Sequence, residues 1–287
     1  MSISSESAPG KILPDLGKLL DAMNRGSKPS AGTVGPGALI VNADDWGRDE
    51  QTTERTLECV LRGAVGSVSA MVFMEDSERA AALARKSGID AGLHLNLTTL
   101  FSMAGCSTKL MGHQQRLSKF LRLSRFTSVV YHPGLANSFE YVVASQLDEF
   151  RRLYGADAER IDGHHHMHLC ANVLLGKLLP EGTRVRRNFT FAAGEKSFGN
   201  RLYRRVVDRM LTRRHRLTDF FFSLAPLEPR ERLQRIFSAA SQWIVELETH
   251  PVNPVEHQFL AGGEIFRWTG ASAIRSFRSL RLATPAN

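Results

Sequence analysis

The chain has 287 residues and a formal net charge of +8, with 43% hydrophobic, 23% charged and 8% aromatic residues. This composition fits one large α/β domain or two small ones, and it excludes a collagen, a coiled coil and a largely disordered chain. There is no apolar run of the roughly 18 residues that a membrane-spanning helix needs, no visible secretory signal, and no close pair among the three cysteines, so we expect a cytoplasmic protein with reduced thiols.

Residues 1–37 are rich in Ser, Gly, Pro and Lys and predict a flexible N-terminal tail with one short amphipathic stretch, Leu13–Met23. The folded domain is expected to occupy residues 38–287. Within it, apolar or β-branched runs alternate with segments of helical periodicity. The predicted strands are Ala38–Asn42, Ser67–Phe73, Ala91–Leu97, Arg160–Asp162, Arg184–Arg187, Asp219–Phe222 and Trp243–Thr249.

Three predicted helices are followed by a glycine, which favours the left-handed backbone that ends a helix. They are Asp49–Arg62 before Gly63, Asp76–Lys86 before Gly88 and Ser138–Leu153 before Gly155. Strands that alternate with helices indicate an α/β fold, and about seven parallel strands in a single domain of about 250 residues predict a distorted (β/α) barrel. An open, doubly wound sheet is the alternative. The polar stretch Thr98–Asn137 contains no clear strand and predicts an insertion after the third strand.

Two adjacent carboxylates, Asp44 and Asp45, follow the first predicted strand. In parallel α/β folds the carboxyl ends of the strands face the active site. Because side chains alternate along a strand, we expect one of the two to bind a cation and the other to hydrogen-bond a bound water. The alternative is a loop in which one Asp caps the following helix.

Histidines lie at the ends of two further strands. His94 shares one face of the third predicted strand with Asn96. His250 ends the last predicted strand, before a proline that fixes the backbone. Either histidine could instead be a structural residue. The functional interpretation of each rests on its place at the end of a strand.

The segment Ile161–His168 is the most specific signal, because it holds four of the ten histidines within five positions. If it is extended, His164, His166 and His168 project to one side, and Asp162 can orient an imidazole by accepting its second N–H. A polar turn that happens to be rich in histidine is the alternative.

Together the strand ends offer carboxylate and imidazole ligands but no thiolate. Such a set suits one catalytic divalent ion with open positions for water; Zn²⁺, Mn²⁺ and Co²⁺ accept it well, whereas Mg²⁺ prefers more oxygen ligands. No phosphate-binding loop, dinucleotide fingerprint or serine-hydrolase elbow is present. A phosphoesterase would more often assemble two metals with bridging carboxylates, so a single-metal site is favoured.

Four motifs in this order resemble the YdjC-like carbohydrate deacetylase family over residues 38 to about 262. They are Asn42-Ala-Asp-Asp-Trp-Gly47, Gly92-Leu-His-Leu-Asn-Leu-Thr98, Asp162-Gly-His-His-His-Met-His168 and Glu248-Thr-His-Pro251. The resemblance implies a distorted (β/α) barrel, related to the polysaccharide deacetylases, that removes acetyl groups from N-acetylated sugars with a divalent metal. Trp46 stands where the family more often has Phe.

The resemblance also implies roles for single residues. The metal ligands correspond to Asp45, His94 and His164, and Asp44 falls at the position of the catalytic base. We expect one divalent ion, Mg²⁺ or Zn²⁺ with Mn²⁺ and Co²⁺ as alternatives, and His250 as the acid that protonates the departing amine. The remaining candidates, for substrate contacts or support of the ligands, are Asp162, His166 and Asn96.

Basic residues are concentrated in Arg184–Arg216. This segment contains eleven Arg and Lys and two acidic residues, so its net charge is +9, whereas that of the rest of the chain is about −1. The arginines recur every three or four residues, which predicts a basic helix face. Such a face could bind an anionic surface or nucleic acid in a non-catalytic protein, contact an anionic membrane in a deacetylase of a lipid-linked or hopanoid-pathway glycoside, or be a solvated helix whose arginines pair with acids elsewhere. We expect an N-acetylated sugar as the substrate and no nucleic acid; a homodimer is compatible with the sequence.

Overall fold

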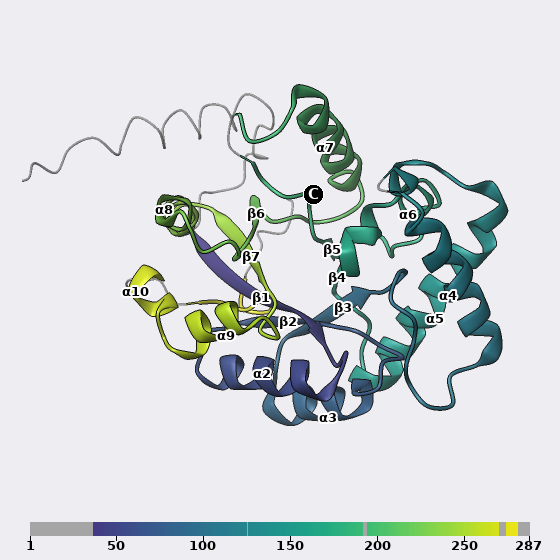
Figure 1. Ribbon diagram of the computed structural model, residues 1–287, viewed down its shortest axis with the longest axis horizontal. Coiled ribbons are helices and arrows are strands. Elements are labelled where there is room, and N and C mark those ends of the chain that lie inside the picture. The colour runs from purple at the N-terminus through teal and green to yellow at the C-terminus, as the bar shows by residue number, and fades with distance from the viewer. Residues whose placement is uncertain (1–36, 125, 192–193, 270–273, 281–287) are drawn as a thin grey trace, which may run out of the picture.

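The computed structural model describes residues 37–124, 126–191, 194–269 and 274–280 (Figure 1). Each of the seven predicted strands has a counterpart, and all neighbouring strands are parallel in the order β5-β4-β3-β2-β1-β7-β6. The strands are β1 (Ala38–Trp46), β2 (Ser67–Ala70), β3 (Ala91–Leu95), β4 (Arg160–Gly163), β5 (Arg184–Val185), β6 (Phe220–Ser223) and β7 (Ile244–Thr249). The predicted tail lies, except for Gly37, outside the described residues.

The sheet curls into a nearly closed barrel. The strand order runs around a ring without the reversal that defines an open, doubly wound sheet, so that alternative is wrong. The two edges, β5 and β6, approach each other where Arg184 of β5 forms a parallel bridge with Arg216, in the segment that leads into β6. The predicted distorted (β/α) barrel in one domain is therefore confirmed.

Helices surround the outer side of this barrel (Figure 1). The α-helices are α2 (Glu50–Leu61), α3 (Ser77–Ser87), α4 (Thr108–Leu121), α5 (Ala136–Tyr154), α6 (Ala171–Leu175), α7 (Phe198–Leu211), α8 (Arg230–Ala239), α9 (Pro254–Ala261) and α10 (Ile265–Thr269). The predicted helix ends hold, because Gly63, Gly88 and Gly155 all adopt positive φ angles. Among the described residues, no helix is both long and apolar enough to cross a membrane.

The insertion after the third strand is helical. It contains α4 and two short 3-10 helices, Thr127–Val129 and Pro133–Leu135, before the crossover helix α5 returns the chain to the sheet. The polar composition concealed α4 because only a narrow set of its residues, including Leu110, Leu117 and Leu121, is buried.

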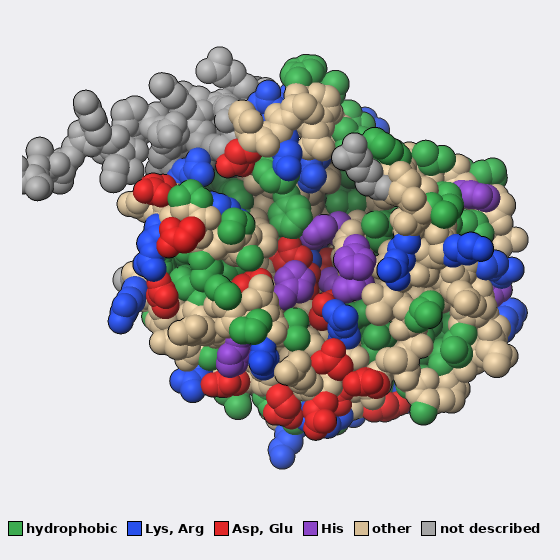
Figure 2. Space-filling view, viewed as in Figure 1, with side chains coloured by type: hydrophobic (Ala, Val, Ile, Leu, Met, Phe, Trp, Pro, Cys, Tyr) green, Lys and Arg blue, Asp and Glu red, His purple; other side chains and the backbone are tan. Residues whose placement is uncertain are grey.

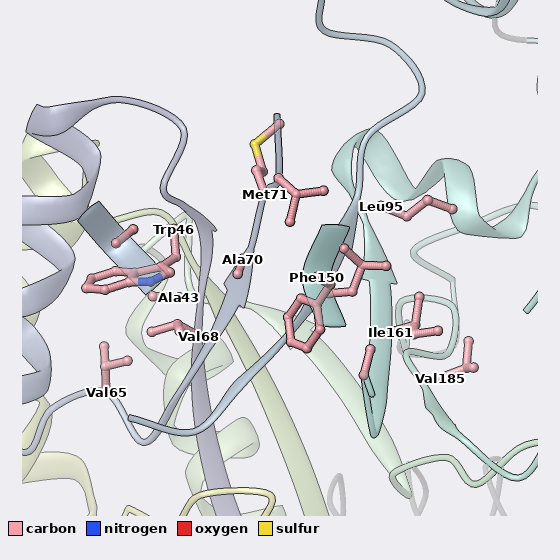
Figure 3. Packing of buried hydrophobic residues seen from close by; sticks show 14 of the residues in the cluster. Ala43, Trp46, Val65, Val68, Ala70, Met71, Leu95, Phe150, Ile161 and Val185 are labelled. Atoms are coloured by element: carbon pink, nitrogen blue, oxygen red, sulfur yellow. The ribbon is translucent and has the colours of Figure 1, made fainter. Parts of the chain in front are cut away.

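The hydrophobic core lies between the outward faces of the strands and the helices. It includes Ala43, Val68, Leu95 and Ile161 from four strands, with Phe150 of α5 (Figure 3). Because alternate residues of a strand point to opposite faces, the next residues along each strand point into the barrel. Those inward residues are mostly polar and buried, and they form the site described next.

Candidate active site

The end of β1 is bulged, and the bulge brings two carboxylates to the same place. Asp45 has φ +65°, in the left-handed region, and the register with β2 shifts between Ala43 and Trp46. Asp and Asn tolerate this conformation better than most residues. As a result Asp44 and Asp45 both approach His94, with Asp44 Oδ2 3.9 Å from Nδ1 and Asp45 Oδ1 3.3 Å from Nε2. The expectation that the two carboxylates diverge by simple strand alternation is wrong.

His94 is oriented by the neighbouring strand. The register of β3 with β4 places His94 beside Asp162, and Asp162 Oδ1 lies 2.7 Å from Nδ1 of His94. This bond leaves Nε2 directed at Asp45. Asp162 is fully buried and its other oxygen accepts hydrogen bonds from Ser69 and Arg160. Asp162 therefore supports the imidazole and has no surface for a substrate.

The histidine-rich segment is a turn and not an extended strand, because His165 and His166 have φ values of 54° and 58°. The predicted projection of His164, His166 and His168 to one side is therefore wrong. His164 turns inward, with Nδ1 2.8 Å from Oδ1 of Asp45. His168 is fully buried, and its Nε2 lies 2.9 Å from a backbone oxygen, that of Arg186.

Gly163 makes this turn possible. A Cβ at position 163 would lie 2.9 Å from the backbone nitrogen of His168 and 3.0 Å from its ring, closer than side-chain atoms normally approach. His165 lies two residues after Gly163, and its Nδ1 is 2.9 Å from the hydroxyl oxygen of Thr98. Within this segment, His164 faces Asp45, whereas His165 and His168 are bonded to neighbouring parts of the chain.

The residues Asp45, His94 and His164 form a donor set that fits a divalent cation. One ligand atom from each lies within 4.8 Å of the others, and all three side chains are buried. Oδ1 of Asp45 faces both imidazoles, yet no donor is oriented to hydrogen-bond it. A buried carboxylate oxygen without a hydrogen bond is costly, and a cation between one carboxylate and two imidazoles would satisfy it.

Two neighbouring groups of acids and histidines are less suited to a cation. In the group of Asp44, His94 and Asp162, Nδ1 of His94 is already bonded to Asp162. In the group of Asp44, Glu248 and His250, Arg186 bonds both oxygens of Asp44. The geometry thus favours one metal position.

Arg186 is the main residue of the site that sequence reasoning missed. Its guanidinium is buried and donates to both oxygens of Asp44, at 2.6 and 2.7 Å, and to Glu246 at 2.7 Å. Burial alone would raise the pKa of Asp44, but the charges of Arg186 and His94 outweigh it and lower that pKa to about 2. Asp44 is therefore ionised near neutral pH.

The interior of the barrel has an excess of negative charge. Its buried carboxyl groups are Asp44, Asp45, Asp162, Glu246 and Glu248, and its buried guanidinium groups are Arg160 and Arg186. Burial and the charge of Asp44 raise the pKa of Glu248 well above its ordinary value, which favours a proton there. Four carboxylates then face two guanidiniums and the protonated imidazole of His94, so a net negative charge remains. Because buried charges need compensation, the interior is suited to a divalent cation.

His94 is protonated on both ring nitrogens, although its Nε2 is the atom that would bind a cation. Burial opposes the protonation of His94, but the charge of Asp44 and the hydrogen bond with Asp162 raise its pKa to about 10. Metal binding requires a neutral imidazole, so a cation would displace this proton.

The outer part of the site holds Glu248, His250 and His166. Oε1 of Glu248 lies 3.8 Å from Nε2 of His250 and 3.9 Å from Nε2 of His166. Glu256 holds the turn that carries His250, because it accepts the backbone N–H of His250 at 3.0 Å and the hydroxyl of Thr249 at 2.7 Å. Both imidazoles are partly exposed, at 36% for His250 and 32% for His166. They can therefore reach a ligand in the opening.

His166 is held in its neutral form at this edge. Burial and the charge of Arg186 lower the pKa of His166 to about 3. Its ring packs edge-on against Phe189 and Phe221. Histidine side chains gather in a hollow at the centre of the molecular face, with acidic side chains beneath them (Figure 2).

Asn96 does not belong to the exposed part of the site. Its side-chain oxygen accepts the backbone N–H groups of Thr98 and Thr99, and its amide nitrogen donates to the carbonyl of Thr99. The residue is fully buried and follows the end of β3. Because the loop uses both polar groups of this side chain, Asn96 offers none of them to a substrate.

Comparison with known proteins agrees with the barrel and its motifs. The sequence profile of the family described as YdjC-like protein matches residues 38–264. A carbohydrate deacetylase of Mus musculus is 32% identical over 148 residues, which are 47% of this chain and 44% of that protein. A chitooligosaccharide deacetylase of Enterobacter sp. (strain 638) is 32% identical over 135 residues, 46% of this chain and 50% of that protein. The chain belongs to the YdjC-like protein family.

These two alignments span half the length of the relatives or less, so they relate this chain to part of each protein. Among solved structures, a proposed cellobiose-phosphate cleavage protein of Enterococcus faecalis V583 superimposes with a TM-score of 0.58. Its sequence is 18% identical, and the superposition covers 84% of this chain and 97% of that chain. This likeness supports the shared fold.

Proposed function

We propose that this protein is a metal-dependent hydrolase that removes acetyl groups from N-acetylated sugars. The observation that carries the proposal is the buried oxygen of Asp45, which faces two imidazoles and has no hydrogen bond. Relatives named carbohydrate and chitooligosaccharide deacetylase support the choice of an acetylated sugar as the substrate.

Asp45, His94 and His164 would hold one divalent ion. When bound, such an ion supplies Lewis-acid polarisation of the acetyl carbonyl and lowers the pKa of a coordinated water. One carboxylate and two imidazoles suit Zn²⁺, Mn²⁺ or Co²⁺ better than Mg²⁺, which prefers a larger number of oxygens.

Asp44 is the proposed general base. Its Oδ1 accepts hydrogen bonds from Asn42 and Arg186, whereas Oδ2 accepts one from Arg186 and faces His94. Oδ2 therefore retains a lone pair that can take a proton from the attacking water. Arg186 keeps the Asp44 carboxylate ionised and fixes its direction. The same interaction lowers the pKa of Asp44 and so makes it a weaker base.

His250 is the proposed general acid for the departing amine. It is exposed enough to meet a substrate, and Glu248 lies beside its Nε2. His166 is a weaker candidate, because its lowered pKa leaves it without a proton to give near neutral pH.

The direct test is acetate release from N-acetylated mono- and oligosaccharides and lipid-linked glycosides. The purified protein is stripped of metal and reloaded with Zn²⁺, Mg²⁺, Mn²⁺ or Co²⁺ in turn. Acetate release that returns with one of these ions supports the proposal and identifies the metal. Folded protein that binds one ion and releases no acetate from any substrate would contradict it.

Asp44→Asn tests the base separately from the ion. The amide cannot accept the proton, so we expect turnover to fall by roughly a thousandfold, while stoichiometric metal binding by calorimetry persists. Asp45→Asn is the matched comparison, because it should lose metal binding and turnover together. Normal turnover of Asp44→Asn would remove Asp44 from the mechanism.

A further inference from the structure

Helix α7 leaves an ordered apolar row on the surface. Phe198, Leu202 and Val206 are spaced by four residues, so they follow one another along a single side of the helix. Their exposed fractions are 73%, 47% and 50%. Such a row is unusual on a surface helix, which normally turns its apolar side toward the core.

A basic row runs beside the apolar row. Arg201, Arg205 and Arg209 are also spaced by four residues, and all three are exposed. None of the three guanidiniums has a carboxylate partner among the residues that the structure describes. The alternative of helix arginines paired with acids elsewhere gains no support at these three positions among the described residues. Arg187 and Arg214, which do pair with acids, lie outside α7.

The opposite side of α7 fixes the helix to the barrel. Val207 and Leu211 are buried there. Asp208 accepts hydrogen bonds from Arg187 and from the backbone of Asn188, both in the segment that follows β5. Because this inner side is already packed and hydrogen-bonded, α7 presents its apolar row outward.

We propose that α7 is a docking surface for an anionic membrane. An apolar row would enter the boundary between headgroups and acyl chains, and the adjacent arginines would bind anionic headgroups. A nucleic acid would use the arginines but would not bury Phe198, Leu202 and Val206. The combination of both rows on one helix therefore favours a lipid surface.

The position of α7 decides which part of the molecule would face the membrane. α7 stands beside the hollow in which the histidines gather, on the face seen in Figures 1 and 2. Docking through α7 would hold that hollow close to the lipid surface. The proposal does not depend on the acetylated substrate, because it rests only on the composition and exposure of α7.

The test is flotation of the full-length protein with phosphatidylcholine vesicles that contain or lack phosphatidylglycerol. We expect binding to the anionic vesicles, weak binding to the neutral ones, and a decrease as salt rises. The variant R201Q/R205Q/R209Q should bind anionic vesicles roughly a hundredfold more weakly. The variant F198S/L202S/V206S should bind anionic vesicles at least roughly tenfold more weakly.

Matched controls lie elsewhere on the surface. Leu61→Ser removes a side chain with the same 73% exposure as Phe198, on helix α2. The variant K86Q/K177Q/R267Q removes three exposed positive charges outside α7 and so gives the same net charge as the arginine variant. Both controls should bind like the unchanged protein. Circular dichroism and melting temperature verify that every variant is folded.

Several outcomes would overturn the proposal. One is no binding to anionic vesicles by folded, full-length protein. Another is a loss of vesicle binding in the control variants as large as that in the α7 variants. Such a result would mean that net charge or general surface apolarity, and not α7, determines binding. Binding to duplex DNA that needs the arginines but not the apolar row would identify a nucleic-acid surface instead. A dimer in light scattering that F198S/L202S/V206S dissociates, without vesicle binding, would identify a second copy of the chain as the partner.

Discussion

The two faces of the same strands have opposite chemistry. On β7, Leu247 points outward into the hydrophobic core, while its neighbours Glu246 and Glu248 point into the barrel, and all three are buried. The outer face is stabilised by the removal of apolar surface from water, which needs no partner of defined geometry. The inner face is stabilised only where each charge meets its counterpart.

This difference separates the stability of the fold from its function. Changes on the outer face should affect stability and leave the chemistry of the site unaltered. Changes on the inner face should affect the pKa of neighbouring groups as well as stability, because the charges there are coupled through Arg186. Each substitution below is chosen to break or sharpen this comparison.

Removal of Arg186 should have the largest effect. Arg186→Met leaves Asp44 and Glu246 buried without their shared cation, and we expect the free energy of unfolding to fall by about 4 kcal/mol. The pKa of Asp44 should rise, which moves the acid limb of the pH–rate profile to higher pH. Urea unfolding and the pH profile measure the two effects.

Two controls accompany this variant. Arg186→Lys keeps the charge but not the paired hydrogen bonds, so it should recover part of the stability. Arg201→Met on the exposed side of α7 should change stability by less than about 0.5 kcal/mol. A loss of stability below about 1 kcal/mol in Arg186→Met would show that the inner charges do not depend on this guanidinium.

The outer face gives the second prediction. Leu247→Ala should lower the free energy of unfolding by about 3 kcal/mol, because it opens a cavity between the sheet and the helices. Metal affinity and the pH profile should stay as in the unchanged protein, although Leu247 is adjacent in sequence to two glutamates of the interior. A shifted pH profile would mean that the two faces are coupled through the strand backbone.

The sequence predicted the outer face of the fold more completely than the inner one. Runs of apolar residues and glycines after helices predicted seven strands and three helix ends, because burial of apolar surface depends on periodicity alone. The helix α4 escaped detection, because its few buried residues lie among many polar ones.

The inner face was predicted only where it carries a recognisable motif. The positions of Asp45, His94 and His164 followed from strand ends and from the resemblance to the family. Arg186 was missed, because its sequence neighbourhood is basic and suggests a surface, although it directly follows Val185, the outward-facing residue that ends β5. The bulge at Asp45 and the turn at His165 depend on φ angles that no local pattern of the sequence specifies.

A close contact inside the barrel gives the third prediction. A Cβ at Gly92 would lie 2.7 Å from Cζ of Arg160 and 2.8 Å from its backbone oxygen. Gly92→Ala should therefore cost about 2 kcal/mol of stability through overpacking. Gly112→Ala on α4 is the control, since a Cβ there meets nothing within 4 Å and alanine favours a helix. Equal stability of both variants would mean that Arg160 moves without cost.

The smallest effect, counted for a change of one pH unit, concerns the buried His168. Burial lowers the pKa of His168 to about 4, below the ordinary value of 6.5 that applies in the unfolded chain. As the pH falls below 6.5, the unfolded chain takes up the proton first, so stability is lost between pH 6.5 and about 4. Between these two pKa values, His168 contributes about 1.4 kcal/mol per pH unit to this loss.

His168→Gln should reduce this loss. Glutamine can still donate a hydrogen bond to the backbone oxygen of Arg186, but it takes up no proton. In metal-free protein, the difference in unfolding free energy between a neutral and a mildly acidic buffer should therefore be smaller in the variant than in the unchanged protein. The same difference in both would mean that folded His168 accepts its proton as readily as the unfolded chain does. Leu247→Ala should leave the difference unchanged, because leucine takes up no proton and its side chain lies on the outer face.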